Sequence, residues 1–187
     1  LFRPRFGESP VYQHHTTSLV FNDPPFHTRV RNSIMGALQP RAIRAMEPSL
    51  IALVELLLDQ AEAKGEFDLI GDYAAAIPVE VIDNLLRVPH ADRGPLRGWS
   101  IDILSVLEPA VTPDLLERGN QAVEDFSDYL CGLIADRRVH LSEDKTDVLS
   151  QLIIGTPSGE KLTEEELIHN CIFLLNAGHE TTTNLIG

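Results

Sequence analysis

The feature that most constrains the fold of this chain is a long helical pattern at its C-terminal end. Thr163-Glu-Glu-Glu166 has the arrangement of a capping box, in which a threonine begins a helix and a glutamate three residues later completes the cap. From Glu164 the pattern continues to Gly187, which is 24 residues, or about 36 Å at the usual helical rise. A helix of this length can cross a whole domain, so other elements must pack around it.

Helical periodicity also dominates the rest of the chain. Between residues 48 and 64 apolar residues recur three and four positions apart, and Gly65 supplies a stop signal. Asp23 is placed to cap a helix that starts with two prolines, because proline is tolerated in a first helical turn. Further helices are expected over residues 78–87, 96–107, 113–138 and 146–154, and only 18–21 is a candidate strand. The sequence therefore predicts a mostly α fold.

Composition places the chain among globular proteins and excludes several partners. The chain has 187 residues, of which 43% are hydrophobic, so it can bury the core of one domain. A formal net charge of −13 disfavours binding to nucleic acid and to anionic membranes. No signal peptide is visible, and the most apolar run, residues 167–179, is too short to span a bilayer. We expect a soluble, cytoplasmic protein without a disulfide scaffold.

The segment from Ala177 to Asn184 interrupts the pattern of the long C-terminal helix. Gly178 and three consecutive threonines are weak helix formers, and the hydroxyl of Thr181 can bond the carbonyl of Ala177, which bends or opens a helix. An opened turn would accept a small molecule beside an acid, Glu180, and an alcohol, Thr181. The competing interpretation is a glycine placed for close packing and threonines that line a buried interface.

A second candidate site lies near the N-terminus, in Asp23-Pro-Pro-Phe-His27-Thr-Arg29-Val-Arg31. His27 and Arg31 are four residues apart, so both lie on one face near the positive end of a helix dipole. That arrangement suits a ligand with carboxylates. The alternative is a capped surface helix whose basic residues are solvated.

Two other constellations are dismissed by their spacing. His179-Glu180 lacks the second histidine of a zinc-binding His-Glu-x-x-His helix. Glu166-Leu-Ile-His169 has the form of half a di-iron site, but no second Glu-x-x-His element exists, so a solvated helix face is expected there. No metal site built from protein ligands is predicted.

Taken together, Asp-Pro-Pro-x-His-x-x-x-Arg at residues 23–31 and Ala-Gly-x-Glu-Thr-Thr at residues 177–182 resemble the cytochrome P450 family, the haem-thiolate monooxygenases. The resemblance is closest to the soluble bacterial members and covers nearly the whole chain. It implies that residues 23–38 correspond to the family's C helix, residues 96–138 to its F and G helices, and the terminal helix to its I helix. We therefore expect residues 1–187 to form a single partial domain, a partial P450 fold from helix C to helix I, truncated before the haem-thiolate core.

The resemblance implies roles for individual residues. The positions that match haem-binding residues of the family are His27, Arg31, Ala177 and Gly178. The positions that match its proton-guiding acid and alcohol are Glu180 and Thr181. The positions expected to face the substrate are Phe173, Asn176 and Ala177, together with a variable loop over residues 11–19. The candidates for docking an acidic redox protein such as a ferredoxin are Arg29, Arg41 and Arg44.

The sequence departs from the family where the iron is bound. The family's Phe-x-x-Gly-x-x-x-Cys-x-Gly loop and its Glu-x-x-Arg helix do not occur in these 187 residues. Cys131 and Cys171 lie in amphipathic helical patterns and are expected to be small buried hydrophobes rather than axial ligands.

The resemblance implies a parent enzyme, an oxidoreductase that activates dioxygen at the iron of haem b (iron-protoporphyrin IX) and oxidises a small apolar substrate. This chain alone is expected to be inactive, with haem absent or weakly bound. Exposure of residues 172–175 is expected to cause self-association. The alternative function is an all-α ligand-binding or interaction module without catalysis.

Overall fold

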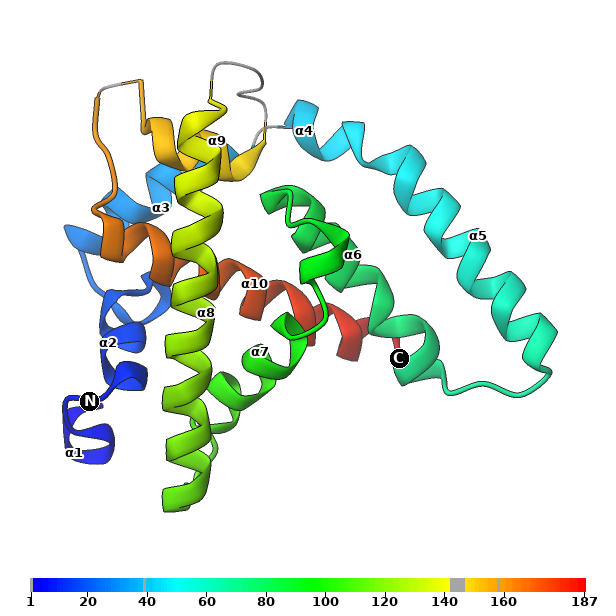
Figure 1. Cartoon of the computed structure of the whole chain (residues 1–187), viewed down its shortest axis with the longest axis horizontal. Coiled ribbons are helices and arrows are strands. Elements are labelled where there is room, and N and C mark those ends of the chain that lie inside the picture. The colour runs from blue at the N-terminus through cyan, green and yellow to red at the C-terminus, as the bar shows by residue number, and fades with distance from the viewer. Residues whose placement is uncertain (1, 39, 142–146, 158) are drawn as a thin grey trace.

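The computed structural model describes residues 2–38, 40–141, 147–157 and 159–187, without the side chains of Arg41 and Ala42. Within these ranges the chain is mostly helical and contains no strand (Figure 1). The α-helices are α1 (Arg3–Phe6), α2 (Pro10–Thr17), α3 (Phe26–Ala37), α4 (Pro40–Ala45), α5 (Glu47–Lys64), α6 (Ala76–Leu86), α7 (Leu96–Ser105), α8 (Pro113–Val139), α9 (Val148–Ile154) and α10 (Glu164–Ile186). Two 3₁₀ turns, η1 (Leu19–Phe21) and η3 (His90–Asp92), and a π-helical segment, η2 (Leu69–Ala74), connect them.

The predicted long helices are confirmed to within a few residues, because their ends carry local signals. α5 ends at Gly65, which adopts the left-handed conformation with φ of 73°. α8 begins where the Thr112 hydroxyl accepts a hydrogen bond from the backbone N–H of Leu115. α10 begins at the predicted capping box, in which Thr163 and Glu166 satisfy each other's backbone N–H groups. The predicted start of α9 at residue 146 lies outside the described residues.

Two local predictions near the N-terminus are wrong. The candidate strand at residues 18–21 is instead Ser18 followed by the 3₁₀ turn η1, which Ser18 precedes as N-cap residue. Asp23 does not cap α3, because the helix begins at Phe26 with Pro25 at its N-cap and without a side-chain cap. The two prolines offer no N–H group for the Asp23 carboxylate to bind.

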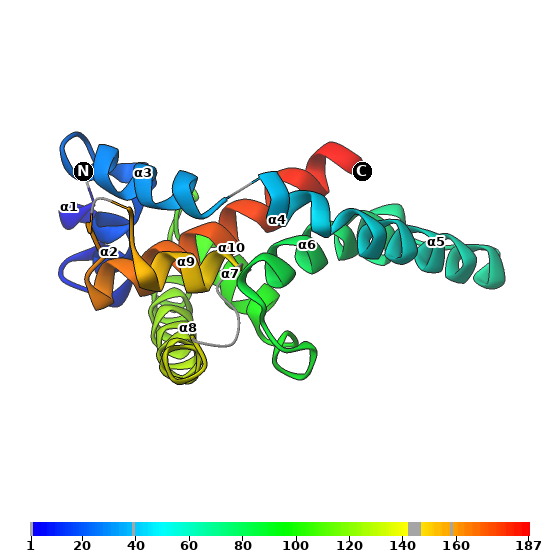
Figure 2. The same cartoon turned by 90° about the horizontal axis from the view of Figure 1, so that it is seen from above.

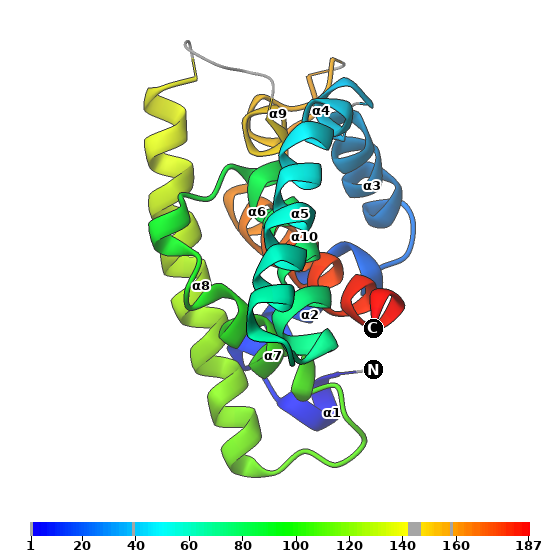
Figure 3. The same ribbon diagram turned by 90° about the vertical axis from the view of Figure 1, so that its right-hand side faces the viewer.

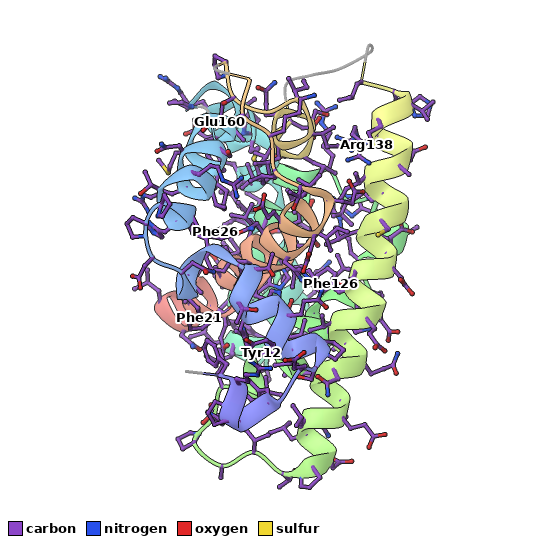
Figure 4. The ribbon with its side chains drawn as sticks, turned by 90° about the vertical axis from the view of Figure 1, so that its left-hand side faces the viewer. Tyr12, Phe21, Phe26, Phe126, Arg138 and Glu160 are labelled. Atoms are coloured by element: carbon purple, nitrogen blue, oxygen red, sulfur yellow. The ribbon has the colours of Figure 1, made fainter. Side chains whose placement is uncertain are left out.

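α10 runs through the centre of the molecule, and other helices pack around it (Figure 1). α6 and α7 pack against its C-terminal half, α8 crosses it, and α2 contacts its N-terminal half. Phe126 of α8 is fully buried and packs against Trp99 of α7, with ring centroids 5.3 Å apart (Figure 4). The largest fully buried apolar residues belong to the elements around α10: Leu86, Leu96, Ile103, Phe126, Leu130, Ile134, Leu149, Leu167, Ile172 and Leu175.

α5 lies at the edge of the molecule and buries none of its residues (Figure 1). It contacts only α4, η2 and α6 to any extent. Its apolar side chains Ile51, Leu56 and Leu58 are each about half exposed. α5 therefore forms from its own helical propensity and from one-sided packing, and its remaining apolar surface faces solvent.

The surface expected to cause self-association differs from the one observed. Ile172 and Leu175 are fully buried, and Phe173 and Leu174 are partly buried against the core. The expectation that residues 172–175 are exposed is therefore wrong, because α6, α7, α8 and α9 already cover this part of α10. Exposed apolar side chains lie instead on several elements, among them three on α5 and Leu185 near the end of α10.

The two cysteines are both free thiols in very different environments. Cys171 is fully buried, as expected, and burial raises the pKa of its thiol to about 12. Cys131 is exposed, so the expectation that it is buried is wrong. It lies on the outer face of α8, three residues before the buried Ile134.

We expect a thiol reagent such as Ellman's reagent to modify one cysteine per native chain quickly, because only Cys131 is accessible. Cys171 should react only when the chain unfolds, since its thiol is buried and its thiolate is disfavoured. Mass spectrometry of the modified peptides checks the assignment. Rapid labelling of Cys171 in the native chain would contradict the buried position of this face of α10.

Candidate functional site

The predicted interruption of α10 does not occur, although the hydrogen bond expected to cause it does. α10 is continuous from Glu164 to Ile186. The Thr181 hydroxyl donates to the backbone carbonyl of Ala177 at 2.8 Å, and the Thr183 hydroxyl donates to that of His179 at 2.7 Å. A carbonyl oxygen has two lone pairs, so it can accept a hydroxyl in addition to the helical amide. The expectation of an opened turn is therefore wrong.

The predicted site residues of α10 fall into an exposed and a buried set. Ala177, Glu180 and Thr181 are exposed. Phe173 is partly buried against the core, and Asn176 is buried with its Oδ1 lacking a hydrogen-bond partner among the described residues. The small side chain at position 177 and the hydroxyl at position 181 are one helical turn apart, so they share an open face of the helix.

Gly178 lies where α10 comes closest to α6. A Cβ atom at this position would be 3.0 Å from Cγ1 of Ile82 and 3.1 Å from its Cβ. Glycine therefore permits the close packing of these two helices, which is the competing interpretation of this motif. A role of Gly178 toward a cofactor stays a prediction.

The basic side chains of α3 that were predicted to bind a ligand, His27 and Arg31, have no partners among the described residues. His27 is half-buried and Arg31 is exposed, one turn apart on the same helix. Neither side chain makes a hydrogen bond or an ion pair with the described residues. Two hydrogen-bond donors without partners among the described residues, one of them an arginine, are thus available near the start of a helix for a ligand that carries carboxylates.

α3 is tied to the beginning of α10 by an ion pair that the sequence did not indicate. Arg29 binds Glu166 with both terminal nitrogens, one of them at 3.0 Å from Oε2. Glu166 is buried, so the expectation of a solvated helix face at Glu166 and His169 is wrong. Arg29 is engaged in this internal contact and is only partly exposed, and its expected role in docking a redox protein stays a prediction. Arg44 is exposed, and the side chain of Arg41 lies outside the described residues.

The two candidate sites lie on the same side of the molecule. In Figure 2 and Figure 3, α3 and the C-terminal half of α10 lie on one side, and α8 lies on the other. The Arg29–Glu166 ion pair fixes α3 against α10 at the opposite end of α10 from Thr181. The basic pair and the open face of α10 are therefore held on one rigid frame.

The segment expected to be a variable substrate loop is mostly the helix α2. Val11, His14 and His15 are buried, so this segment has fewer free side chains than a loop would have. The Asn120 side chain accepts a hydrogen bond from the backbone N–H of Val11, and the Asn170 side chain accepts one from Leu19. These contacts fix the segment to α8 and α10. Its role toward a substrate stays a prediction.

A cavity of about 180 Å³ lies between α7 and the C-terminal half of α10. Its polar lining includes Arg97 and Ser100 of α7 and His179, Glu180 and Thr183 of α10. No sequence pattern indicated this cavity, because residues from four separate elements, η2, α6, α7 and α10, line it. Glu180 lies between the exposed face of α10 and this cavity, whose lining is mixed polar and apolar.

Comparison with known proteins shows which family this helical arrangement belongs to. The sequence profile of the family "Cytochrome P450" matches residues 99–186. A putative cytochrome P450 of Bacillus subtilis, YjiB, is 34% identical over 172 residues, which are 90% of this chain and 43% of that protein. A putative cytochrome P450 of Xylella fastidiosa, 133B1, is 33% identical over 99% of this chain and 46% of its own length. The chain belongs to the cytochrome P450 family.

The solved structures agree with this assignment. P450BioI, crystallised in complex with a hexadec-9Z-enoic acid ligated acyl carrier protein, has a TM-score of 0.84 and 31% identity. The match covers 97% of this chain and 45% of that one. This P450 chain thus spans less than half the length of its relatives, and its fold is part of the P450 fold. Among the described residues, no helix combines the length and apolar character needed to cross a membrane.

Members of the P450 family bind haem. The candidate residues of this chain can be compared with the propionates and with one face of that cofactor. His27 and Arg31 are hydrogen-bond donors without partners among the described residues, which suits a group with two propionates. Ala177 and Thr181 leave an open strip on α10 with only small side chains. Neither Cys131, on the outer face of α8, nor Cys171, buried in the core, is placed on this strip. That His27, Arg31 and the Ala177–Thr181 face hold the propionates and one face of a haem stays a prediction, and neither of the two thiols lies on that face.

Proposed function

We propose that this chain is the central part of a bacterial-type cytochrome P450 monooxygenase, an oxidoreductase that oxidises a small apolar substrate. The observation that carries the proposal is that the unpaired His27 and Arg31 and the open Ala177–Thr181 face lie on one side of a P450-like frame. Haem, when bound, supplies the activation of dioxygen at its iron. This chain by itself is proposed to be inactive, because it contributes no thiolate.

The chain's own residues have distinct parts in this function. His27 and Arg31 would bind the haem propionates through charge-assisted hydrogen bonds. Ala177 leaves space beside the helix, where a larger side chain would block a ligand. The proton of the Thr181 hydroxyl is held by the carbonyl of Ala177, which leaves the hydroxyl oxygen free to accept a hydrogen bond. Glu180, exposed and bordering the cavity beside α7, is placed to bring protons from solvent to this face.

Partners and location are part of the same proposal. Phe173, Asn176 and Ala177 would face the substrate, and Arg29 and the more exposed Arg44 are the described candidates for docking an acidic redox protein such as a ferredoxin. P450BioI, a relative in structure, is known in complex with an acyl carrier protein, which makes a carrier-bound substrate a second possibility to test. A cytoplasmic location and self-association of the isolated chain, through the apolar side chains of α5, are also proposed.

The test uses the protein encoded by the complete reading frame that contains this chain. After reduction and exposure to carbon monoxide, its absorption spectrum should show the Soret band of thiolate-ligated haem. Arg31→Leu and His27→Leu should each weaken haem retention by about tenfold or more, because each loses a hydrogen bond to a charged group. The matched control is Arg118→Leu, an exposed arginine of α8. A protein that binds no haem would favour the all-α binding module.

A further inference from the structure

A buried acid and a buried histidine face each other where α6 meets α10. Asp83 of α6 is 0% exposed and His179 of α10 is 5% exposed. Oδ1 of Asp83 is 3.9 Å from Nε2 of His179. Among the described residues, neither carboxylate oxygen and neither ring nitrogen has a hydrogen-bond partner. Four unsatisfied polar atoms at one helix contact are unusual, because nearly all buried polar groups are hydrogen-bonded.

Arg93, the cation that approaches Asp83 most closely, is already bound elsewhere. Its guanidinium donates to Glu80, Asn84 and the backbone carbonyl of Val88, at 2.7 to 3.0 Å. It reaches Oδ2 of Asp83 only at 3.9 Å, which is too long for a hydrogen bond. His179 lies at the same distance, but its ring nitrogens have no partner among the described residues, so it has a free donor for Asp83 where Arg93 does not.

The charges around the pair come from four elements. Glu80 of α6 and Arg93 face Asp83, Tyr129 of α8 lies within its electrostatic reach, and Arg97 of α7 faces His179. Burial raises the pKa of Asp83 to about 6, partly opposed by Arg93. Burial, and then Arg97, lower the pKa of His179 to about 4. Near neutral pH the expected state is therefore an anionic carboxylate beside a neutral imidazole that still carries one N–H.

The pair lies beside a close contact between the two helices. Gly178, the neighbour of His179, brings the α10 backbone against Ile82, the neighbour of Asp83. The gap of 3.9 Å exceeds a normal hydrogen bond by about 1 Å. A small side-chain rotation or one bridging water closes such a gap.

We propose that Asp83 is a positioning residue that acts through His179: its carboxylate accepts a hydrogen bond from the Nε2–H of His179, directly or through one water, and fixes the rotation of α10 against α6. Two residues along a helix are separated by about 200° around its axis. Holding His179 toward α6 therefore keeps Ala177 and Thr181 turned away from α6, on the exposed face. The value of that orientation for catalysis rests on the proposed function, but the hydrogen bond itself does not.

The first test follows both partners by NMR in the 187-residue chain, with no haem present. At pH 7, where the carboxylate is ionised and the imidazole neutral, Asp83→Asn should change the ¹⁵N shifts of the His179 ring, because the proton on Nε2 loses its charged acceptor. His179→Gln should raise the pKa of Asp83 further, because the ionised carboxylate loses the N–H of the imidazole. The matched control is His169→Gln, a buried histidine of the same helix about 15 Å away, which should leave Asp83 unchanged.

The second test separates a hydrogen bond from simple packing. Asp83→Asn keeps an acceptor oxygen, whereas Asp83→Leu fills the space without one. Backbone amides over residues 177–183 should exchange with solvent about tenfold faster in Asp83→Leu and near the wild-type rate in Asp83→Asn. An unchanged ring ¹⁵N shift of His179 in Asp83→Asn, or equal exchange in both Asp83 variants, would overturn the inference. Neither result depends on haem, so failure here is distinct from failure of the proposed function.

Discussion

Replacing Glu166 with alanine is expected to lower the unfolding free energy by about 2–4 kcal/mol. The substitution removes both hydrogen bonds from Arg29 and the bond that the Glu166 carboxylate accepts from the backbone N–H of Thr163. It also leaves the Arg29 guanidinium, which is only partly exposed, without its carboxylate partner. Urea denaturation followed by circular dichroism measures the change.

Glu164 provides the matched control for this substitution. It lies in the same first turn of α10 and binds Arg138 of α8, but both side chains are about half exposed. An exposed pair contributes about 0–1 kcal/mol, so Glu164→Ala should cost less than 1 kcal/mol. Equal losses for Glu164→Ala and Glu166→Ala would show that the bonds of Glu166 to Arg29 and Thr163 contribute no more than the exposed pair of Glu164 with Arg138.

The pH dependence of this contact has a definite sign. Burial by itself raises the pKa of Glu166, but the hydrogen bonds from Arg29 and Thr163 outweigh burial, and the net pKa is lowered. A carboxylate with a lowered pKa in the folded state stabilises the fold above its unfolded pKa and loses that contribution as the pH falls below it. The unfolding free energy of Glu166→Gln should therefore fall less than that of the wild type when the pH drops below about 4.5.

The sequence was sufficient to predict the long helices, but not the short helices and turns between them. α5, α8 and α10 were predicted because caps and periodicity are local, and Gly65 and Thr112 mark ends that need no tertiary contact. The short helices α1, α2 and α4 were missed, since they are too short for a periodic pattern to emerge. The π-helical segment η2 was missed because its hydrogen-bonding pattern has no sequence signature.

Side-chain burial could not be deduced from patterns on single helices. The Glu166–His169 element was expected on a solvated face, yet α2 and α3 pack over it and bury both residues. Conversely, α5 has a regular apolar pattern but buries nothing in this chain. Amphipathic spacing shows which face of a helix is able to be buried, while the neighbouring elements decide whether it is. The same holds for Asp83 and His179, which are 96 positions apart and meet only in the fold.

His15→Phe is expected to stabilise the chain, and to do so most strongly in mild acid. His15 is buried among the rings of Phe2, Phe6 and Phe21, whose centroids lie 5.1 to 5.9 Å away. Neither ring nitrogen of His15 has a hydrogen-bond partner among the described residues. Phenylalanine keeps the aromatic packing and removes two unsatisfied polar atoms, which should contribute about 1–3 kcal/mol at neutral pH.

The acid response follows from the protonation of this histidine. Burial, and then the charge of Arg5, lower the pKa of His15 from 6.5 to about 4. A histidine whose pKa is lowered in the folded state reduces the unfolding free energy when the pH falls below its unfolded pKa of 6.5, because the unfolded chain binds the proton more tightly. The reduction grows until the pH reaches the folded pKa of about 4. At pH 5 that loss is about 2 kcal/mol for His15. His15→Phe removes it, so the difference from wild type should grow between pH 7 and pH 5.

Equilibrium unfolding in urea at pH 7, 6 and 5 measures this difference, with His140→Phe as the control. His140 lies at the exposed C-terminal end of α8, so its substitution should leave the pH dependence of stability unchanged. His14 and His169, ring neighbours in the same buried cluster, also have a lowered pKa, and they retain part of the acid sensitivity in His15→Phe. The expected result is thus a shallower pH slope and not a flat one. An unchanged slope would mean that His15 is already hydrated in the native chain, and that the N-terminal helices α1 and α2 do not seal this cluster from water.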